Sequence, residues 1–232
     1  MQNLRITLVQ TSLYWEDRQR NLNHLEGLIG GLRSKTDIIV LPEMFSSGFS
    51  MDTTSECDTM EGESIKWMQN LAQSLDLVIC GSLKIKEEGK FYNRFIWMQP
   101  DATLKHYDKR HLFSFAGEDR HFTKGKDKVI IEYKGWKILP LICYDLRFPV
   151  WSKNRLINGK AEYDLLLYTA NWPEARSVAW RSLLLSRAIE NQVFVAGVNR
   201  IGEDGKMIHT MILPCRLDGS SKRYNLCPVL SM

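Results

Sequence analysis

Apolar residues recur along the first third of the chain with two different spacings. Between residues 22 and 32, and again between 65 and 75, they return every three or four positions, which predicts two amphipathic helices. Residues 5–10, 38–41 and 77–83 are instead short apolar runs of the kind found in strands. The pattern therefore predicts the order strand, helix, strand, helix, strand.

Turn-forming residues divide the middle of the chain into shorter segments. Residues 91–98 and 104–107 are strand-like, and a turn at Gln99-Pro100-Asp101 separates them. Residues 129–133 and 136–142 have the same character and are expected to form a second hairpin.

The last third returns to longer elements. We expect a helix near residues 151–156, a strand at 165–169, a long helix at about 177–191 and a strand at 193–198. Strands that alternate with helices, with hairpins inserted between them, predict an α/β fold in which a mixed sheet is covered by helices.

Composition is consistent with one folded domain over residues 1–232. Of the 232 residues, 44% are hydrophobic and 25% are charged, and no linker-like change in composition divides the chain. The net charge of +4 is spread out, and the densest basic group, residues 124–134, is interrupted by Asp127 and Glu132. We expect a solvated face there rather than a nucleic-acid interface.

The five cysteines are widely spaced and include no CxxC pair, which argues against a structural zinc site. The first residues show no basic segment followed by an apolar one, as a signal peptide would. No apolar stretch approaches the ~20 residues that a membrane helix needs. These patterns predict a cytoplasmic protein without a membrane partner, in which a cysteine is a nucleophile or fills the core.

Three apolar segments end in a reactive side chain. Glu43 follows the run that begins at Ile38, Lys109 follows residues 104–107, and Cys143 follows residues 136–142. Each alone has an ordinary explanation, since a cysteine after a strand is usually inert core and a charged residue at a strand end is usually surface. Together, a carboxylate, an amine and a thiol at strand ends can meet in one pocket.

The sequences around these residues resemble the nitrilase, or carbon–nitrogen hydrolase, superfamily. The resemblance is carried by LPEMFSSGF, YDKRHLF and LICYDLRFP and extends from about Leu4 to Gly205. It implies a four-layer αββα sandwich, with two mixed sheets flanked by helices, and no metal or organic cofactor. It also implies that Glu43 is the general base, Lys109 stabilises the oxyanion and Cys143 is the nucleophile.

Two further site residues follow from the same resemblance. Glu118, in FAGEDRHF, stands where many members have a second glutamate that positions the substrate and the lysine. Its alternative interpretation is a solvated loop residue. The backbone N–H of Tyr144, next to the nucleophile, is the expected second donor to the oxyanion.

The substrate is expected to be a small amide. DKRHLFSFAGE, CYDLRFP and YTANWPEAR resemble the omega-amidase branch, which cleaves the terminal amide of 2-oxoglutaramate or 2-oxosuccinamate. Arg147 could bind the substrate carboxylate or could pair with a carboxylate such as Asp145. Phe115 and Trp172 are candidate pocket walls, although either could be a core aromatic. Carbamoyl amines and aliphatic amides, which the same catalytic residues can hydrolyse, remain alternatives.

The resemblance weakens near Gly205, and the segment from about residue 209 is atypical of the superfamily. We hypothesise a reading-frame shift or a truncation near His209. An inactive relative with a binding or structural role is therefore an alternative, although the intact Glu43, Lys109 and Cys143 argue against it. A thiol redox protein is disfavoured because no resolving cysteine lies near Cys143. The resemblance also implies a homodimer.

Overall fold

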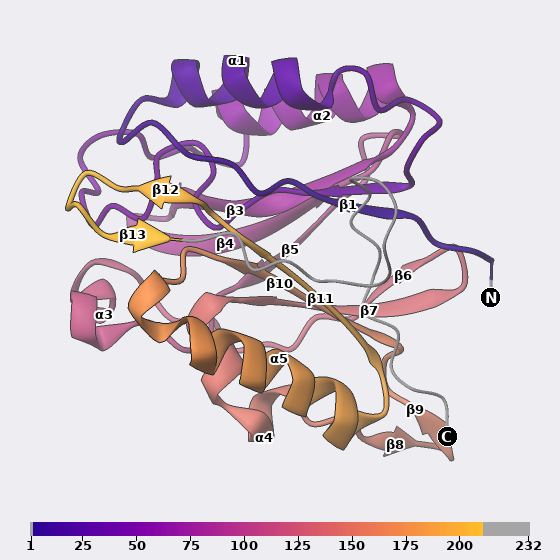
Figure 1. Ribbon diagram of the computed structural model, residues 1–232. Coiled ribbons are helices and arrows are strands. Elements are labelled where there is room, and N and C mark those ends of the chain that lie inside the picture. Colours follow the sequence, from indigo (N-terminus) through magenta and orange to yellow (C-terminus); the bar gives the residue numbers. More distant parts are fainter. Residues whose placement is uncertain (1, 211–232) are drawn as a thin grey trace.

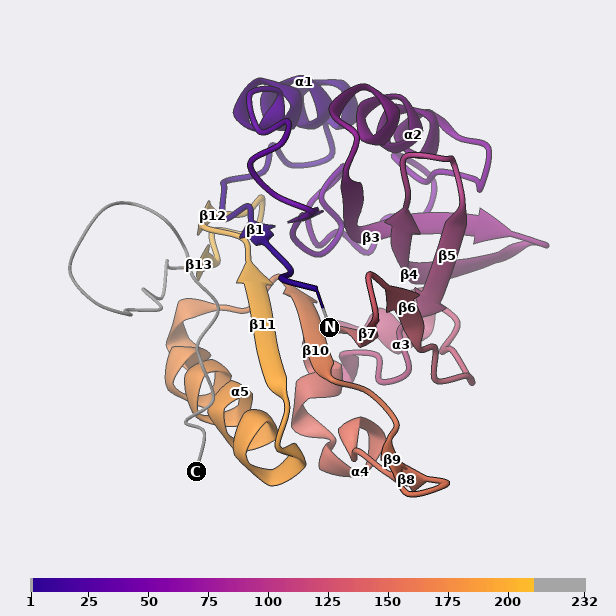
Figure 2. The ribbon, with the colours of Figure 1, turned by 90° about the vertical axis from the view of Figure 1, so that its right-hand side faces the viewer.

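Two β-sheets packed face to face form the centre of the molecule, and helices cover both outer faces (Figures 1 and 2). The structure is a computed structural model that describes residues 2–210. Figure 1 shows the four layers from top to bottom: helices, sheet, sheet, helices. This arrangement confirms the expected αββα sandwich.

The first sheet has five strands in sequence order and is mixed. Its first three strands are parallel and its last three are joined as antiparallel hairpins. The strands are β1 (Ile6–Leu8), β2 (Ile38–Val40), β3 (Val78–Glu87), β4 (Lys90–Met98) and β5 (Leu104–Asp108). Helices α1 (Arg18–Ile29) and α2 (Glu63–Leu75) cover its outer face, because their apolar stripes pack on that side of the strands.

The second sheet has four strands in the order β11-β10-β7-β6 and is also mixed. The pairs β11–β10 and β10–β7 are parallel, and β7 and β6 form an antiparallel hairpin. The strands are β6 (Ile131–Tyr133), β7 (Trp136–Ile142), β10 (Leu165–Ala170) and β11 (Phe194–Asn199). The long helix α5 (Ser177–Asn191) covers its outer face together with the short helix α4 (Pro149–Ser152).

The remaining elements are short. They are the helix α3 (Glu118–His121), the 3-10 turns η1 (Ser114–Ala116), η2 (Cys143–Arg147) and η3 (Glu174–Arg176), and the hairpin strands β8 (Leu156–Ile157), β9 (Lys160–Ala161), β12 (Gly202–Glu203) and β13 (His209–Thr210). Three of them, α3 and the β12–β13 hairpin, lie at the same end of the sandwich as the start of α5 (Figure 1).

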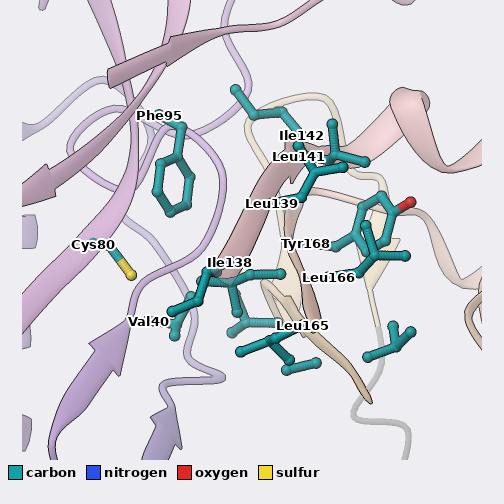
Figure 3. Close-up of a cluster of buried hydrophobic side chains, with 14 of the residues drawn as sticks. Val40, Cys80, Phe95, Ile138, Leu139, Leu141, Ile142, Leu165, Leu166 and Tyr168 are labelled. Carbon is teal, nitrogen blue, oxygen red and sulfur yellow. The ribbon is translucent and has the colours of Figure 1, made fainter. Parts of the chain in front are cut away.

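The main core lies between the two sheets. Val40, Cys80 and Phe95 of the first sheet face Ile138 and Leu165 of the second, all of them buried (Figure 3). Each large aliphatic side chain that is fully buried in this way contributes ~1.5–3 kcal/mol of transfer free energy. The core therefore fixes how the two sheets sit on each other, and with them the strand ends that carry the reactive residues.

One predicted element is wrong. The helix expected at residues 151–156 is the single turn α4, and Leu156 already begins strand β8. The side chain of Asn154 explains the early end, because its Oδ1 accepts the backbone N–H of Glu162 and its Nδ2 donates to the carbonyl of Tyr163. These bonds close the β8–β9 hairpin instead of extending the helix.

Within residues 2–210, no helix is both long and apolar enough to cross a membrane. Of the atypical segment that begins near residue 209, only His209 and Thr210 fall within the described residues, as strand β13. The rest of that segment, and the hypothesis that concerns it, lie outside them.

Candidate active site

Glu43 lies three residues after the end of β2 and is fully buried. Leu41 still bonds to the neighbouring strand, since its N–H donates to Cys80, and its carbonyl accepts the hydroxyl of Thr169 on β10. The Glu43 carboxylate then accepts the backbone N–H of Asn171 through Oε2 at 2.8 Å. A residue carried by the first sheet is thus held against the second.

Lys109 follows β5 and is equally buried, with its ammonium between two carboxylates. Its Nζ lies 2.8 Å from Glu43 Oε1 and 2.9 Å from Glu118 Oε2. Glu118 begins α3 directly after Gly117, whose φ of +76° is in the left-handed region that favours glycine. Glu118 Oε2 also accepts the backbone N–H of Phe113 at 2.6 Å.

Cys143 lies where β7 ends and the turn η2 begins, with a φ of +43° that is uncommon for a residue other than glycine. The buried carboxylate of Asp145 holds this turn. Its Oδ2 accepts the Ile142 N–H at 3.0 Å and the Tyr107 hydroxyl at 2.8 Å, and its Oδ1 accepts the His111 N–H at 2.9 Å. The strained backbone of Cys143 is therefore fixed by bonds to the strand before it and to the segment after β5.

Charge and burial act together on the reactive groups. Burial raises the pKa of the Cys143 thiol well above its usual value, the Glu43 carboxylate raises it further, and the Lys109 ammonium opposes both. Burial alone would lower the pKa of Lys109, but the Glu118 and Glu43 carboxylates outweigh it and raise that pKa. Burial raises the pKa of Glu118 as well. These shifts favour the uncharged form of the thiol and the charged form of the lysine.

A pocket opens over Cys143 at the end of the sandwich where α3 lies. Aromatic rings form much of its wall, and arginine and lysine side chains lie on its rim. Among its lining residues are Phe49, Phe113, Tyr144, Trp172, Arg147, Arg176 and Lys206, together with one carboxylate, that of Asp204. An apolar pocket with a few polar groups, one reactive thiol and a cationic rim suits a small anionic organic molecule.

The structure brings together most of the residues that the sequence singled out. Glu43, Lys109, Glu118 and Cys143 form one cluster, and Tyr144, Arg147 and Trp172 line the pocket. The Arg147 guanidinium lies 5.1 Å from the Trp172 ring centre, and it makes no ion pair with Asp145 within residues 2–210.

Phe115 does not line the pocket, because its side chain is 84% exposed. It lies in the 3-10 turn η1, where residues three apart share a face. Phe113 and Ala116, which are three apart, line the pocket and leave Phe115 outside it. The aromatic wall expected from Phe115 is supplied by Phe113.

Sequence reasoning missed several residues of the site besides Phe113. Asn93 and Asn171 contact the Glu43 carboxylate, Phe49 lies 5.3 Å from the Lys109 ammonium, and Arg176 lines the pocket. A usable signal existed only for Asn93, a polar residue on the inward face of a strand that otherwise buries Phe95 and Trp97. Within residues 2–210, no group of three or more His, Cys, Asp or Glu side chains could hold a metal ion.

The chain is similar over most of its length to proteins of known class. The carbon-nitrogen hydrolase family model matches residues 5–216. The protein therefore belongs to the carbon–nitrogen hydrolase family, and it is a hydrolase acting on carbon–nitrogen bonds other than peptide bonds.

Individual relatives narrow the class further. Omega-amidase YafV of Escherichia coli (strain K12) is 47% identical over 209 residues, which cover 90% of this chain and 79% of the relative. The 2-oxoglutaramate amidase of Bacillus subtilis (strain 168) is 31% identical, covering 86% and 77%. These similarities support the omega-amidase branch of the superfamily, as the sequence predicted.

A solved structure supports the fold. The crystal structure of XC1258 from Xanthomonas campestris, a CN-hydrolase superfamily protein with an arsenic adduct in the active site, superposes with a TM-score of 0.89. It is 43% identical, and the match covers 90% of this chain and 80% of that one.

Proposed function

We propose that the protein hydrolyses a small omega-amide through a thioester on Cys143, with Glu43 as general base and Lys109 as oxyanion donor. The observation that carries the proposal is that these three buried side chains lie together and that one of them, Cys143, lines a pocket that also holds three cationic side chains. The names of two relatives, an omega-amidase and a 2-oxoglutaramate amidase, agree with it.

The first half of the reaction forms the thioester. Because the resting thiol is neutral, Glu43 takes its proton as Sγ attacks the carbonyl carbon of the amide. Negative charge then develops on the carbonyl oxygen, where the Lys109 ammonium and the Tyr144 N–H are the proposed donors. That N–H lies in the first turn of η2, where backbone N–H groups have no acceptor within the helix. Glu43 returns the proton to the leaving nitrogen, and ammonia departs.

The second half releases the acid. Water enters the position that ammonia leaves, Glu43 removes its proton, and the hydroxide attacks the thioester carbonyl. The carbon–sulfur bond breaks, the carboxylic acid product forms and releases its own proton to solvent, and the thiolate regains a proton from Glu43. Glu118 keeps the Lys109 ammonium in place during both steps, since it accepts hydrogen bonds from Nζ through both of its oxygens.

The rim of the pocket favours a substrate with a carboxylate. Arg147 and Arg176 lie over the rings of Trp172 and Phe113, at 5.1 and 5.2 Å from the ring centres. Within the described residues, neither guanidinium has an ion-pair partner. Two guanidinium groups held on aromatic faces around a thiol can bind the carboxylate of a 2-oxo acid amide bidentately. Neutral aliphatic amides offer no group for them.

Ammonia release from 2-oxoglutaramate by the purified protein tests the proposal. We expect turnover that Cys143→Ala and Glu43→Gln abolish and that Cys57→Ala, which changes a free cysteine outside the pocket, leaves intact. We expect Arg176→Met to raise KM for 2-oxoglutaramate roughly tenfold or more, as the loss of a charged hydrogen-bond donor does. Turnover that survives Cys143→Ala would rule out the thioester.

We also propose that the protein is a homodimer. Val178, Leu185 and Ile189 on the outer face of α5 are 77%, 62% and 62% exposed, and their spacing places them on one side of the helix. A second copy of the chain is the occupant that we propose for this stripe. Light scattering should give the dimer mass for the wild type and the monomer mass for Leu185→Glu, and a monomeric wild type would contradict the proposal.

Two further assignments stay proposals. We propose that the chain is a single carbon–nitrogen hydrolase domain, since one core runs between both sheets and joins the early and late strands. We propose a cytoplasmic location, because a thiol nucleophile needs a reducing compartment. Limited proteolysis and cell fractionation test these two assignments.

A further inference from the structure

Asn93 occupies the inward face of β4, directly beneath the catalytic cluster, and is fully buried. Its backbone carbonyl accepts the N–H of Lys109 at 2.9 Å, which continues the pairing between β4 and β5 by one residue. Asn93 thus fixes the backbone from which the catalytic lysine projects. Its side-chain amide hydrogen-bonds to the two carboxylates of the cluster, so it is placed to act through them.

The side chain of Asn93 binds both catalytic carboxylates at once. Its Nδ2 donates to Glu43 Oε1 at 2.8 Å and to Glu118 Oε1 at 2.9 Å. The same two oxygens accept from Lys109 Nζ at 2.8 and 3.0 Å. Two donors and two acceptors therefore close a ring of four hydrogen bonds, with the ammonium and the amide on opposite sides.

The ring uses both hydrogens of the amide and leaves its oxygen alone. Asn93 Oδ1 is buried and has no hydrogen-bond partner among the described residues. The opposite orientation would place that oxygen against two carboxylates, where it would be repelled. The amide is thus oriented by the carboxylates, and it is the neutral donor that a site with one ammonium and two carboxylates still requires.

We propose that Asn93 is a positioning residue for the amidase reaction, which holds Glu43 and Glu118 in place around Lys109 by donating a hydrogen bond to each. With Oε1 of Glu43 held by two donors, its Oε2 is left toward Asn171, whose N–H is also among the groups that lower the pKa of Cys143. We therefore assign Oε2 as the oxygen that accepts the thiol proton.

The sign of the pH effect follows from this geometry. The titratable groups that face one another here are Glu43 after β2, Lys109 after β5, Glu118 on α3 and Cys143 on η2. Removing the Asn93 donor disfavours the ionised form of Glu118, so this carboxyl retains its proton to higher pH. The acid limb of the activity profile must then move upward.

Asn93→Leu tests the proposal, since it keeps the approximate volume and removes the donor. We expect kcat for 2-oxoglutaramate to fall roughly 10- to 100-fold with KM nearly unchanged, and the acid limb of kcat/KM to rise by about one pH unit. The acid limb of Cys143 alkylation by iodoacetamide should move the same way. Asn93→Ser, which keeps one O–H donor, should lie between wild type and Asn93→Leu and serves if the leucine variant does not fold.

A matched control separates positioning from stability. Asn191 is also buried, and among residues 2–210 its side chain bonds to Arg187, Asn154 and Glu190, all outside the site. Asn191→Leu should lower the melting temperature but leave both pH profiles in place. If the folded Asn93 variants behave in the same way, the positioning role is overturned.

The inference rests on the proposed function for its kinetic measurement only. Alkylation of Cys143 needs no amide substrate. A wild-type protein without ammonia release but with a shifted alkylation limb in Asn93→Leu would refute the omega-amidase proposal and leave the positioning role standing.

Discussion

Asp145 holds the turn that presents the nucleophile, and the substitution Asp145→Asn should both destabilise the protein and slow it. The carboxylate is fully buried and accepts hydrogen bonds from Ile142, Tyr107 and His111, the last through both its backbone N–H and its ring. These hydrogen bonds all end on a carboxylate that lies two residues after Cys143 in the chain.

The magnitude can be worked out from these partners. If the introduced amide nitrogen takes the place of Oδ2, the Tyr107 hydroxyl must turn to accept a hydrogen bond instead of donating one. The Ile142 N–H is then left without an acceptor. The amide nitrogen fits better in the place of Oδ1, which faces His111, because the ring Nδ1 can accept a hydrogen bond in its other tautomer. The backbone N–H of His111 then loses its acceptor. One hydrogen bond is lost, and the others change from a charged acceptor to a neutral one. Together these changes lower the free energy of unfolding by ~2–4 kcal/mol.

Urea denaturation followed by tryptophan fluorescence measures this loss. We expect a lower midpoint with an unchanged slope, and slower ammonia release because the φ of +43° at Cys143 is no longer held. Asp127→Asn is the control, since Asp127 is exposed and should change stability by less than ~0.5 kcal/mol. Equal stability of the two variants would refute the view that Asp145 fixes the turn.

Three further predictions concern stability. Gly125→Ala should cost ~2–4 kcal/mol in urea denaturation, because a Cβ there would lie 2.1 Å from the Asp108 carbonyl oxygen, and equal stability would contradict the packing. Gly27 is exposed on α1, and a Cβ there would meet no atom within 4 Å, so Gly27→Ala should instead stabilise the protein by ~0.5–1 kcal/mol in the same assay. Burial alone would raise the pKa of Asp37, but hydrogen bonds from two cationic side chains lower it to about 2. The ionised carboxylate therefore contributes fully to the free energy of unfolding above pH ~3.9, and this contribution is lost as the pH falls toward 2. Asp37→Asn should flatten that part of an acid titration of the melting temperature, and an unchanged acid midpoint would refute the assignment.

Much of the fold could be predicted from periodicity. The long helix expected at 177–191 has those bounds in α5, and the strands of both sheets appear where apolar runs were found. The helix expected at 151–156 failed because a side-chain hydrogen bond of Asn154 closed a hairpin, which no apolar spacing records. Periodicity reports burial, and it is silent where a single polar side chain decides the path of the chain.

The sequence also singled out Glu43, Lys109 and Cys143, which stand at strand ends within recognisable local sequences and lie together in the structure. Their catalytic roles stay proposals. The residues that hold these side chains could not be predicted. Asn171 contributes a backbone N–H, which every residue type has, and Asn93 acts only because β4 lies beside β5 and under Glu43. Their roles depend on which strands are neighbours, and a single sequence does not state that.

The cluster is assembled across the two sheets, and this has a consequence for how the core and the chemistry are coupled. Glu43 belongs to the first sheet, yet its Oε2 accepts the backbone N–H of Asn171, which follows β10 of the second. The Thr169 hydroxyl donates to the Leu41 carbonyl at 2.7 Å across the same gap. A shift of one sheet over the other would move the base relative to the thiol, and misplacement by ~1 Å can cost a hundredfold in rate. The packing between the sheets (Figure 3) is therefore part of the catalytic geometry as well as of the stability.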